Sequence, residues 1–501
     1  MNEKTEQRMV RRASALGVMA MLIAGAAPGC GSSDSSSGKP GDGDPPGSIP
    51  DPDTVPPTVV SRTPNDGADA VSVRAPIQVK FSEPVKLGAK PVTLVIGNQE
   101  LATTATLSAD ATTMTISPNS PIVTPAQVKV ALEDISDIRG NRLVSNALWT
   151  WTAPLWLAVG DTVRGNGYQS TTIAVGPGDR VSAASFYNNN ADPPRVIVHS
   201  IEGNNGKWAA LADPFDVDDR LPPKLAVDRD GTTVMAFGPK STEKLGLIRR
   251  WSGAQWDAMG TEFGPTAPDS VRFGLAAGSN GKLFAAHQVP DTNSNSHVAV
   301  RTFEGGGWIL LGDTVDGGDG GYLTSMTLDK NGIPYVAYRS GSATSLEAHV
   351  RTWSGSSWKP VGSSPGKNTS TSFDLAFNDA GTLFALITSA ESRRSSSRLF
   401  RFDGTNWQAV GAPLSTGECS YLSCGSSCLS SGTDGHVVAF TQLEGASPRA
   451  FEATKDGWTP LDLPPGNSRG VQACSADSRG TVVVGEIAAD GSRINVHRLN
   501  R

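Results

Sequence analysis

A short segment, Arg351-Thr352-Trp353-Ser354-Gly355-Ser356-Ser357-Trp358, recurs along this chain with small changes. A related segment, Arg301-Thr302-Phe303-Glu304-Gly305, precedes Trp308. Each of these segments is typical of two short strands around a turn. The tryptophans that end them recur every 48 to 52 residues, and such a period indicates a repeat architecture. The tryptophan occurs at seven positions, which are Trp156, Trp208, Trp256, Trp308, Trp358, Trp407 and Trp458.

A second repeated element lies between the tryptophan segments. Apolar residues 225–227 lead through a turn at Gly231 into apolar residues 234–237, which predicts another pair of strands. Two pairs make four strands in each period, and seven such units predict an all-β, seven-bladed β-propeller over residues 154–501. Each turn carries a glycine where a positive φ is required. These glycines are Gly178, Gly231, Gly281, Gly332, Gly381, Gly435 and Gly480.

The two ends of the repeat region complement each other. Trp156 has no preceding strand of the repeated type, whereas residues 493–499 form such a strand and are followed by no tryptophan. We therefore expect the N- and C-terminal strands of the region to pair in one composite blade. This pairing would close the ring and cover strand edges that an open sheet would expose.

The N-terminus has the features of an export signal. Basic residues, the last of them Arg12, precede an apolar run over residues 13–27, so residues 1–29 are predicted to be a signal peptide. The run ends at Ala27-Pro28-Gly29-Cys30, which resembles a bacterial lipoprotein cleavage box. This resemblance implies that Cys30 carries a lipid and that the protein is anchored to the cell envelope, at the outer membrane or cell surface. Secretion without a lipid is the alternative.

Residues 30–56 are rich in Ser, Gly, Pro and Asp, and such a composition predicts a disordered linker. After the linker, residues 57–153 alternate short apolar and polar runs between turn residues, as in a β-sandwich. The motifs Pro56-Pro57-Thr58-Val59-Val60-Ser61 and Ile77-Gln78-Val79-Lys80-Phe81-Ser82-Glu83-Pro84 resemble the SbsA-type bacterial Ig-like domain. Domains of that type serve as spacers in exported proteins, so the resemblance implies a stalk.

Besides Cys30, four cysteines remain, and an even number in an exported chain favours two disulfides. The spacing permits three connectivities, and a bridge between adjacent blades is one of the possibilities. Zinc is the alternative, although the spacing does not follow paired C-x2-C ligands. The four residues are Cys419, Cys424, Cys428 and Cys474.

Composition and motifs restrict the function. The net charge of -6 offers no basic surface for nucleic acid. The chain carries no nucleophile elbow, no H-E-x-x-H and no phosphate-binding glycine loop. The period of the blades resembles that of kelch and galactose-oxidase propellers, but the paired glycine of kelch repeats is missing from most blades, so no catalytic residue can be transferred from those families.

Features shared by most blades are interpreted as packing features, including the repeated tryptophans and a basic column formed by Arg249, Arg301, Arg351 and His497. Function is expected where the blades differ, in their connecting loops. The candidate residues of this ligand face are Asp216, Asp218, Asp316, Asp319 and Tyr322. Asp316 and Asp319, among glycines, could also bind calcium, although no cofactor is required by the sequence.

The sequence favours a monomeric, non-enzymatic binding protein whose propeller engages a glycan or a protein, with the membrane contacted through the lipid alone. An exported polysaccharide hydrolase or lyase is the alternative, and it would need converging carboxylates. A purely structural envelope protein is the third possibility. Carboxylates available to an enzyme include Asp216, Asp218, Glu262, Asp269 and Glu391.

Overall fold

The computed structural model divides the chain into two units, residues 1–54 and 55–501. It describes residues 53–501 except 145–147, 166, 188–194, 204–205, 217–222, 238–246, 262–272, 291–294, 343–344, 368, 392–393, 419–425, 433–434, 444–446, 467 and 477–479. The predicted signal peptide, the Cys30 lipidation site and most of the linker therefore lie outside the described residues. The described part is almost entirely β, with one short 3-10 helix, η1 (Pro177–Asp179).

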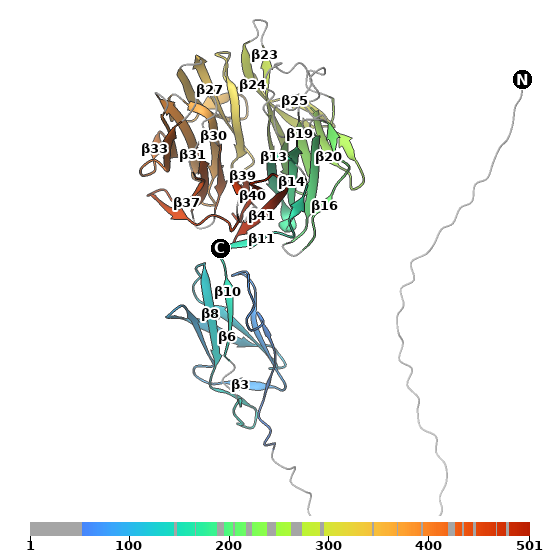
Figure 1. Ribbon diagram of the computed structural model, residues 1–501, viewed down its shortest axis with the longest axis vertical. Helices are drawn as coiled ribbons and strands as arrows, with labels where there is room; N and C mark the ends of the chain where they lie inside the picture. Colours follow the sequence, from blue (N-terminus) through green and yellow to red (C-terminus); the bar gives the residue numbers. More distant parts are fainter. Residues whose placement is uncertain are drawn as a thin grey trace, which may run out of the picture. The chain divides into compact units, whose positions relative to one another are not determined.

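Residues 59–153 form the predicted sandwich from two four-stranded antiparallel sheets and one strand pair (Figure 1). Side chains alternate between buried and exposed along β8, as expected for a strand with one face on a core. The inner faces of the two sheets pack together around buried residues such as Phe81, Met114 and Trp149. The sheets consist of β1 (Val59–Thr63), β2 (Ile77–Phe81), β7 (Thr113–Pro118) and β6 (Thr103–Leu107); β10 (Trp149–Ala153), β8 (Ala126–Leu132), β4 (Val92–Ile96) and β5 (Gln99–Leu101); and β3 (Val85–Leu87) with β9 (Ile135–Asp137).

The described residues after 154 form seven further antiparallel sheets. Their strands are β11 (Trp156–Ala158), β12 (Val163–Arg164), β41 (Arg493–Leu499), β40 (Val482–Ala488) and β39 (Ser468–Ala476); β13 (Tyr168–Val175), β14 (Val181–Tyr187), β15 (Arg195–Ile201), β16 (Ala209–Ala210) and β17 (Phe215–Asp216); β18 (Lys224–Val227), β19 (Thr233–Phe237), β20 (Leu247–Trp251) and β21 (Trp256–Ala258); β22 (Phe273–Ala277), β23 (Leu283–Pro290), β24 (Ser296–Glu304) and β25 (Gly307–Leu310); β26 (Tyr322–Leu328), β27 (Pro334–Ser342), β28 (Ser345–Trp353) and β29 (Trp358–Pro360); β30 (Thr369–Phe377), β31 (Leu383–Glu391), β32 (Arg394–Phe402), β33 (Trp407–Ala409) and β34 (Ser415–Glu418); and β35 (Ser426–Ser431), β36 (Val437–Gln442), β37 (Arg449–Ala453) and β38 (Trp458–Leu461).

The first strands of these sheets contact one another in chain order, from β13 through β18, β22, β26, β30 and β35 to β39. Strand β39 in turn contacts β13, so the succession returns to its start. The arrangement is propeller-like (Figure 1). That the sheets are the blades of one seven-bladed ring stays a prediction.

The predicted turn glycines lie between the first and second strands, and all seven have a positive φ, from 69° at Gly178 to 80° at Gly281 and Gly381. In one of these turns the Asp228 carboxylate stabilises the loop, because its Oδ1 accepts hydrogen bonds from the backbone N–H groups of Asp230 and Thr232. A side chain with a Cβ would be strained at Gly231.

Six of the seven repeated tryptophans connect a sheet to the one before it through a hydrogen bond. The Trp308 indole Nε1 donates a hydrogen bond of 2.7 Å to the Met259 carbonyl oxygen, and Trp358 donates likewise to Leu311. Trp156 repeats the bond across the junction of the two chain ends, at 2.7 Å to the Asp462 carbonyl oxygen. This shared contact explains the conspicuous period as a packing requirement. The remaining bonds of this type join Trp208 to Val159, Trp407 to Val361 and Trp458 to Ala412.

The predicted pairing of the two chain ends is confirmed. Strand β11 pairs antiparallel with β41, and Trp156 lies opposite Leu499. The prediction of four strands per unit is wrong for three sheets, in which β12, β17 and β34 add a fifth strand. In each case the third strand is longer than its first outer partner, and the added strand pairs with backbone groups that would otherwise lack partners.

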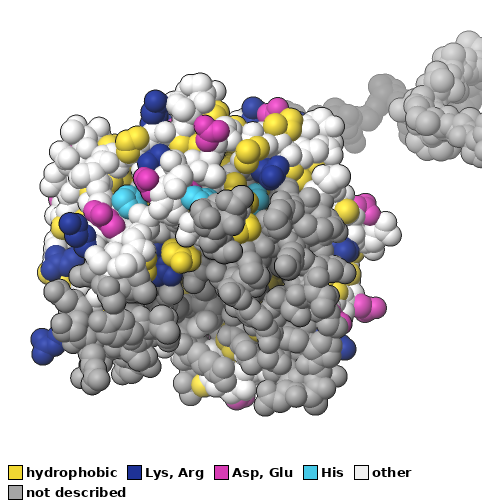
Figure 2. All heavy atoms as spheres, turned by 90° about the horizontal axis from the view of Figure 1, so that it is seen from above, with side chains coloured by type: hydrophobic (Ala, Val, Ile, Leu, Met, Phe, Trp, Pro, Cys, Tyr) yellow, Lys and Arg dark blue, Asp and Glu magenta, His cyan; other side chains and the backbone are white. Residues whose placement is uncertain are grey.

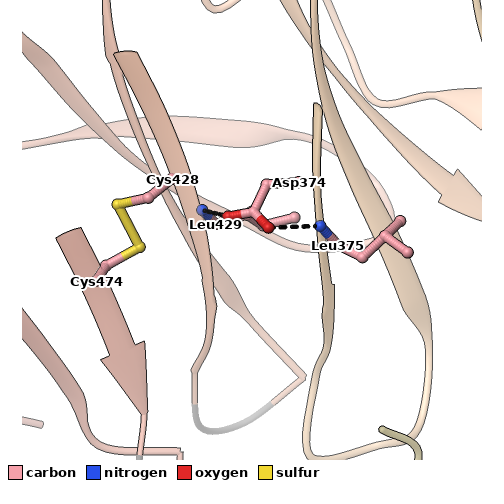
Figure 3. Close-up of a disulfide and its surroundings, with 5 residues drawn as sticks. All are labelled: Asp374, Leu375, Cys428, Leu429 and Cys474. Atoms are coloured by element: carbon pink, nitrogen blue, oxygen red, sulfur yellow. Dashed lines mark hydrogen bonds between the residues drawn. A yellow bond between two sulfur atoms is a disulfide. The ribbon is translucent and has the colours of Figure 1, made fainter. Parts of the chain in front are cut away.

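A disulfide joins Cys428 of β35 to Cys474 of β39, with 6.0 Å between the two Cα atoms (Figure 3). It links the first strands of two adjacent sheets, which is the bridge between neighbouring units that the sequence allowed. The Asp374 carboxylate on β30 lies beside it and accepts hydrogen bonds from the backbone N–H groups of Leu429 and Leu375. Cys419 and Cys424 lie outside the described residues.

Candidate functional site

The loop between β25 and β26 contains two of the candidate ligand residues, Asp316 and Asp319, and Asp316 fixes its shape. The Asp316 side chain is fully buried. Its Oδ1 accepts a hydrogen bond from the Val298 N–H, and its Oδ2 accepts one from the Gly320 N–H, both at 2.9 Å. The same Oδ2 lies 2.6 Å from the His297 Nδ1. These contacts occupy both oxygens, so Asp316 anchors the loop, and calcium binding there stays an untested expectation.

Tyr322 begins β26 immediately after this loop, and its side chain is 42% exposed although it is large and aromatic. It pairs across the sheet with Arg339 of β27. The Arg339 Cζ lies 5.7 Å from the centre of the Tyr322 ring, within the range of a cation–π contact. The pair offers an apolar ring face beside a cationic hydrogen-bond donor. We call Tyr322 and Arg339 the aromatic platform.

Tyr338, His349 and Arg351 lie together on β27 and β28. The rings of Tyr338 and His349 stack with their centres 5.1 Å apart, and Arg351 hydrogen-bonds the Tyr338 side chain. Burial raises the pKa of Tyr338, while Arg351 opposes that shift, so the phenol keeps its proton at neutral pH. Burial lowers the pKa of His349, so this imidazole is neutral there. The His349 Nε2 lies 2.9 Å from the Ser340 Oγ.

An open pocket of about 60 Å³ adjoins these three residues. The outer part of the same sheet and the segment that follows it complete the lining, with Gly362, Ser363 and Ser364. Pockets for whole small molecules usually measure roughly 300–1,000 Å³. The described part of this region therefore offers a shallow binding surface with one small recess.

Comparison with the other sheets separates what is repeated from what is particular. Each residue of the basic column makes the same kind of diagonal contact with the second strand of its sheet. Its side chain contacts the residue that lies two positions after the one it directly opposes. The repeated contact supports the packing interpretation, whereas the composition of the pair varies. The pairs are Arg249 with Phe237 (5.8 Å, Cζ to ring centre), Arg301 with His287 (3.2 Å, Nε to Nε2), Arg351 with Tyr338, and His497 with Glu486 (3.8 Å, Nε2 to Oε2).

The candidates from the sequence fall into three groups. Asp319 is exposed and lies close enough to Tyr338 and His349 to affect the pKa of both, whereas Tyr322 pairs with Arg339. Asp216 lies on β17 of another sheet, 3.4 Å from the Arg195 Nε. Asp218, Glu262 and Asp269 lie outside the described residues, as does the side chain of Glu391. Figure 2 shows one face of the molecule, on which histidine, acidic and basic side chains lie close together.

Neither Tyr338, Arg339 nor His349 was singled out from the sequence, and Arg351 was interpreted as a packing residue. The sequence did contain a signal for Tyr338 and His349, because the hairpin of β27 and β28 places these two residues opposite each other. Directly opposed residues in an antiparallel pair lie on the same face of the sheet. Aligning the hairpins by their tryptophans would have shown that this unit alone has a Tyr–His pair at that position.

One family model matches part of the chain, since residues 53–153 match the bacterial Ig-like domain. No curated protein matches the chain. Among solved structures, the SapL1 lectin in complex with alpha methyl fucoside is 12% identical, with a TM-score of 0.40 over 60% of this chain and 98% of that chain. The polysaccharide lyase Uly1 is also 12% identical, with a TM-score of 0.41 over 69% and 92%.

A chain of the mitotic checkpoint complex is 11% identical, with a TM-score of 0.43 over 67% of this chain and 92% of that chain. These likenesses are too distant to assign a function. Within the described part of the chain, no helical segment has the length and apolar character needed to cross a membrane.

Proposed function

We propose that this protein is a non-enzymatic glycan-binding protein of the cell envelope, in which a seven-bladed propeller carries the site and the Ig-like domain is a spacer. The aromatic platform is the observation that supports this proposal. Sugar rings present apolar C–H faces bordered by hydroxyl groups. An exposed tyrosine can pack on such a face, while Arg339 and Asp319 supply a donor and an acceptor for the hydroxyls.

The proposal includes the lipid on Cys30, which would hold the protein at the outer membrane or cell surface. The linker and the Ig-like domain would then separate the binding face from the anchor. Its partner is a glycan, with no role for nucleic acid. Labelling with a fatty-acid analogue, compared between the natural chain and Cys30→Ala, tests the anchor, and equal labelling of the two would refute it.

A glycan array probed with the whole chain, with and without calcium, tests the binding function. We expect saturable binding, and we expect the Tyr322→Ala variant to bind about tenfold or more weakly. A stacked aromatic ring contributes more binding free energy than the burial of its apolar area alone. The exposed Ile309→Ala variant on the neighbouring sheet should leave binding unchanged. Binding that is equal in the Tyr322→Ala variant would refute the platform as the site.

The alternative is a polysaccharide-active enzyme, which needs two carboxylates on either side of a scissile bond if it is a glycosidase of the usual kind. Of the carboxylates considered for that role, Asp216 alone has a described side chain, and it lies beside Arg195. The array distinguishes the alternatives, because an enzyme would release shortened products from a glycan that it binds.

A further inference from the structure

The recess lined by Tyr338, His349 and Arg351 has an unusual set of polar groups. Its lining includes one guanidinium, one imidazole, one phenol and two serine side chains, from Arg351, His349, Tyr338, Ser363 and Ser364. Among the described residues that line it there is no carboxylate. We propose that this recess is an anion subsite that receives the carboxylate or sulfate group of an acidic glycan, an inference that rests on the proposed function.

The size of the recess fits a charged substituent better than a sugar ring. Its volume is about 60 Å³, and a single water needs roughly 10–15 Å³ by this measure. The recess therefore has room for the few heavy atoms of a carboxylate or sulfate group. The ring that bears this group would remain outside the recess.

Arg351 is held in place before any ligand arrives. Its guanidinium hydrogen-bonds Tyr338, and it passes so close to the loop that a Cβ on Gly317 would lie 3.2 Å from its Nη1. A fixed guanidinium presents parallel N–H donors that match the oxygens of a carboxylate or sulfate. Fixing it in advance reduces the entropy lost on binding.

The charges around the recess add selectivity. The whole chain carries a net charge of -6, so polyanions gain nothing from its average field. Asp319 and Glu347 both affect the pKa of His349, yet neither lines the recess. These two carboxylates border the recess around the Arg351 guanidinium, so an anionic group is attracted at the recess and repelled beside it.

Calorimetric titration of the whole chain with three polysaccharides tests the inference. Polygalacturonate supplies carboxylates, a sulfated galactan supplies sulfates, and an unsubstituted galactan supplies neither. We expect at least one acidic polymer to bind about tenfold or more tightly than the neutral galactan, because hydrogen bonds to charged groups are the stronger ones. Which acidic polymer binds identifies the anionic group.

Two variants assign this selectivity to the recess. Arg351→Met should remove the preference for the acidic polymer, and the exposed Ser363→Glu should do the same by placing a carboxylate at the opening without disturbing the core. Arg398→Met, which removes one exposed charge from β32, is the matched control and should keep the preference. A thermal melt of each variant shows whether the fold is retained.

The outcomes separate this inference from the proposed function. If the neutral galactan binds as tightly as the acidic polymers, glycan binding stands and the anion subsite is refuted. If Ser363→Glu and Arg398→Met weaken acidic binding equally, the effect is one of overall charge and the subsite is again refuted. If no polysaccharide binds, both proposals fail.

Discussion

At the scale of single residues, a repeated tryptophan such as Trp308 couples an outer strand to the preceding sheet, so its loss affects two sheets at once. Trp308 is 8% exposed, its ring centre lies 5.1 Å from that of Phe303, and its indole bonds Met259. Trp308→Ala should lower the free energy of unfolding by roughly 3–5 kcal/mol, measured by urea denaturation. Ile309→Ala on the same strand, 52% exposed, should change it little. An equal effect of both substitutions would contradict the packing role.

Two buried histidines predict how stability depends on pH. Burial lowers the pKa of His287 to about 4, aided by the nearby Arg301, and burial lowers the pKa of His497 to about 4. In the unfolded chain both return to the ordinary value of 6.5. The unfolded state therefore binds more protons below pH 6.5, so stability is full above that pH and falls as the pH drops towards 4.

Urea denaturation from pH 7 to pH 4 measures this loss, which amounts to roughly 3 kcal/mol for each histidine. The His287→Asn and His497→Gln variants should lose less stability over the same range, because neither new side chain titrates. If both variants retain the pH dependence of the natural chain, the histidines are not its source.

Residues that recur could be predicted from the sequence, whereas the residues of the site could not. The seven tryptophans share one packing role and the seven glycines share one kind of turn, so their regular spacing reveals both sets in the sequence. Tyr338 and His349 occur as a pair in one unit, and no period marks them. Asp316 was recognised as special, but its burial depends on Val298 and His297 of another strand, a contact that depends on the three-dimensional fold.

At the scale of elements, β41 joins the two ends of the repeat region, because it pairs with β40 on one side and with β11 and β12 on the other. Deletion of residues 492–501 should open the ring, since β11 and β12 lose their partner and the Trp156 contacts lose their support. We expect a lower melting temperature and increased proteolysis. A deletion variant that melts like the full chain would refute closure by this strand.

The order of the elements was predictable, because alternation of apolar residues and turn glycines are local signals. The added strands β12, β17 and β34 were not. Each is at most four residues long and pairs with the part of a third strand that extends past its outer partner. Strand length is set by pairing between distant segments, so it cannot be read from the short segment alone.

At the scale of the whole molecule, Asn500 connects the sandwich to the repeat region. Its side-chain Oδ1 accepts a hydrogen bond from the Val73 N–H at 2.9 Å, and its Nδ2 donates to the carbonyl oxygens of Val71 and Pro154. Its own carbonyl oxygen accepts from the Thr124 hydroxyl at 2.8 Å. The side chain is 2% exposed, so these bonds are made away from water.

Asn500→Ala should uncouple the sandwich from the repeat region, because the partly buried Val73 N–H loses its acceptor, at a cost of roughly 1–3 kcal/mol. Calorimetry should show one melting transition for the natural chain and two for the variant, with the sandwich melting earlier. Asn331→Ala removes an exposed amide from a turn and serves as the control, which should retain a single transition. Because Asn500→Ala leaves β41 in place, it also distinguishes loss of this junction from opening of the ring in the deletion variant. One unchanged transition in Asn500→Ala would mean that the sandwich is not coupled through this residue.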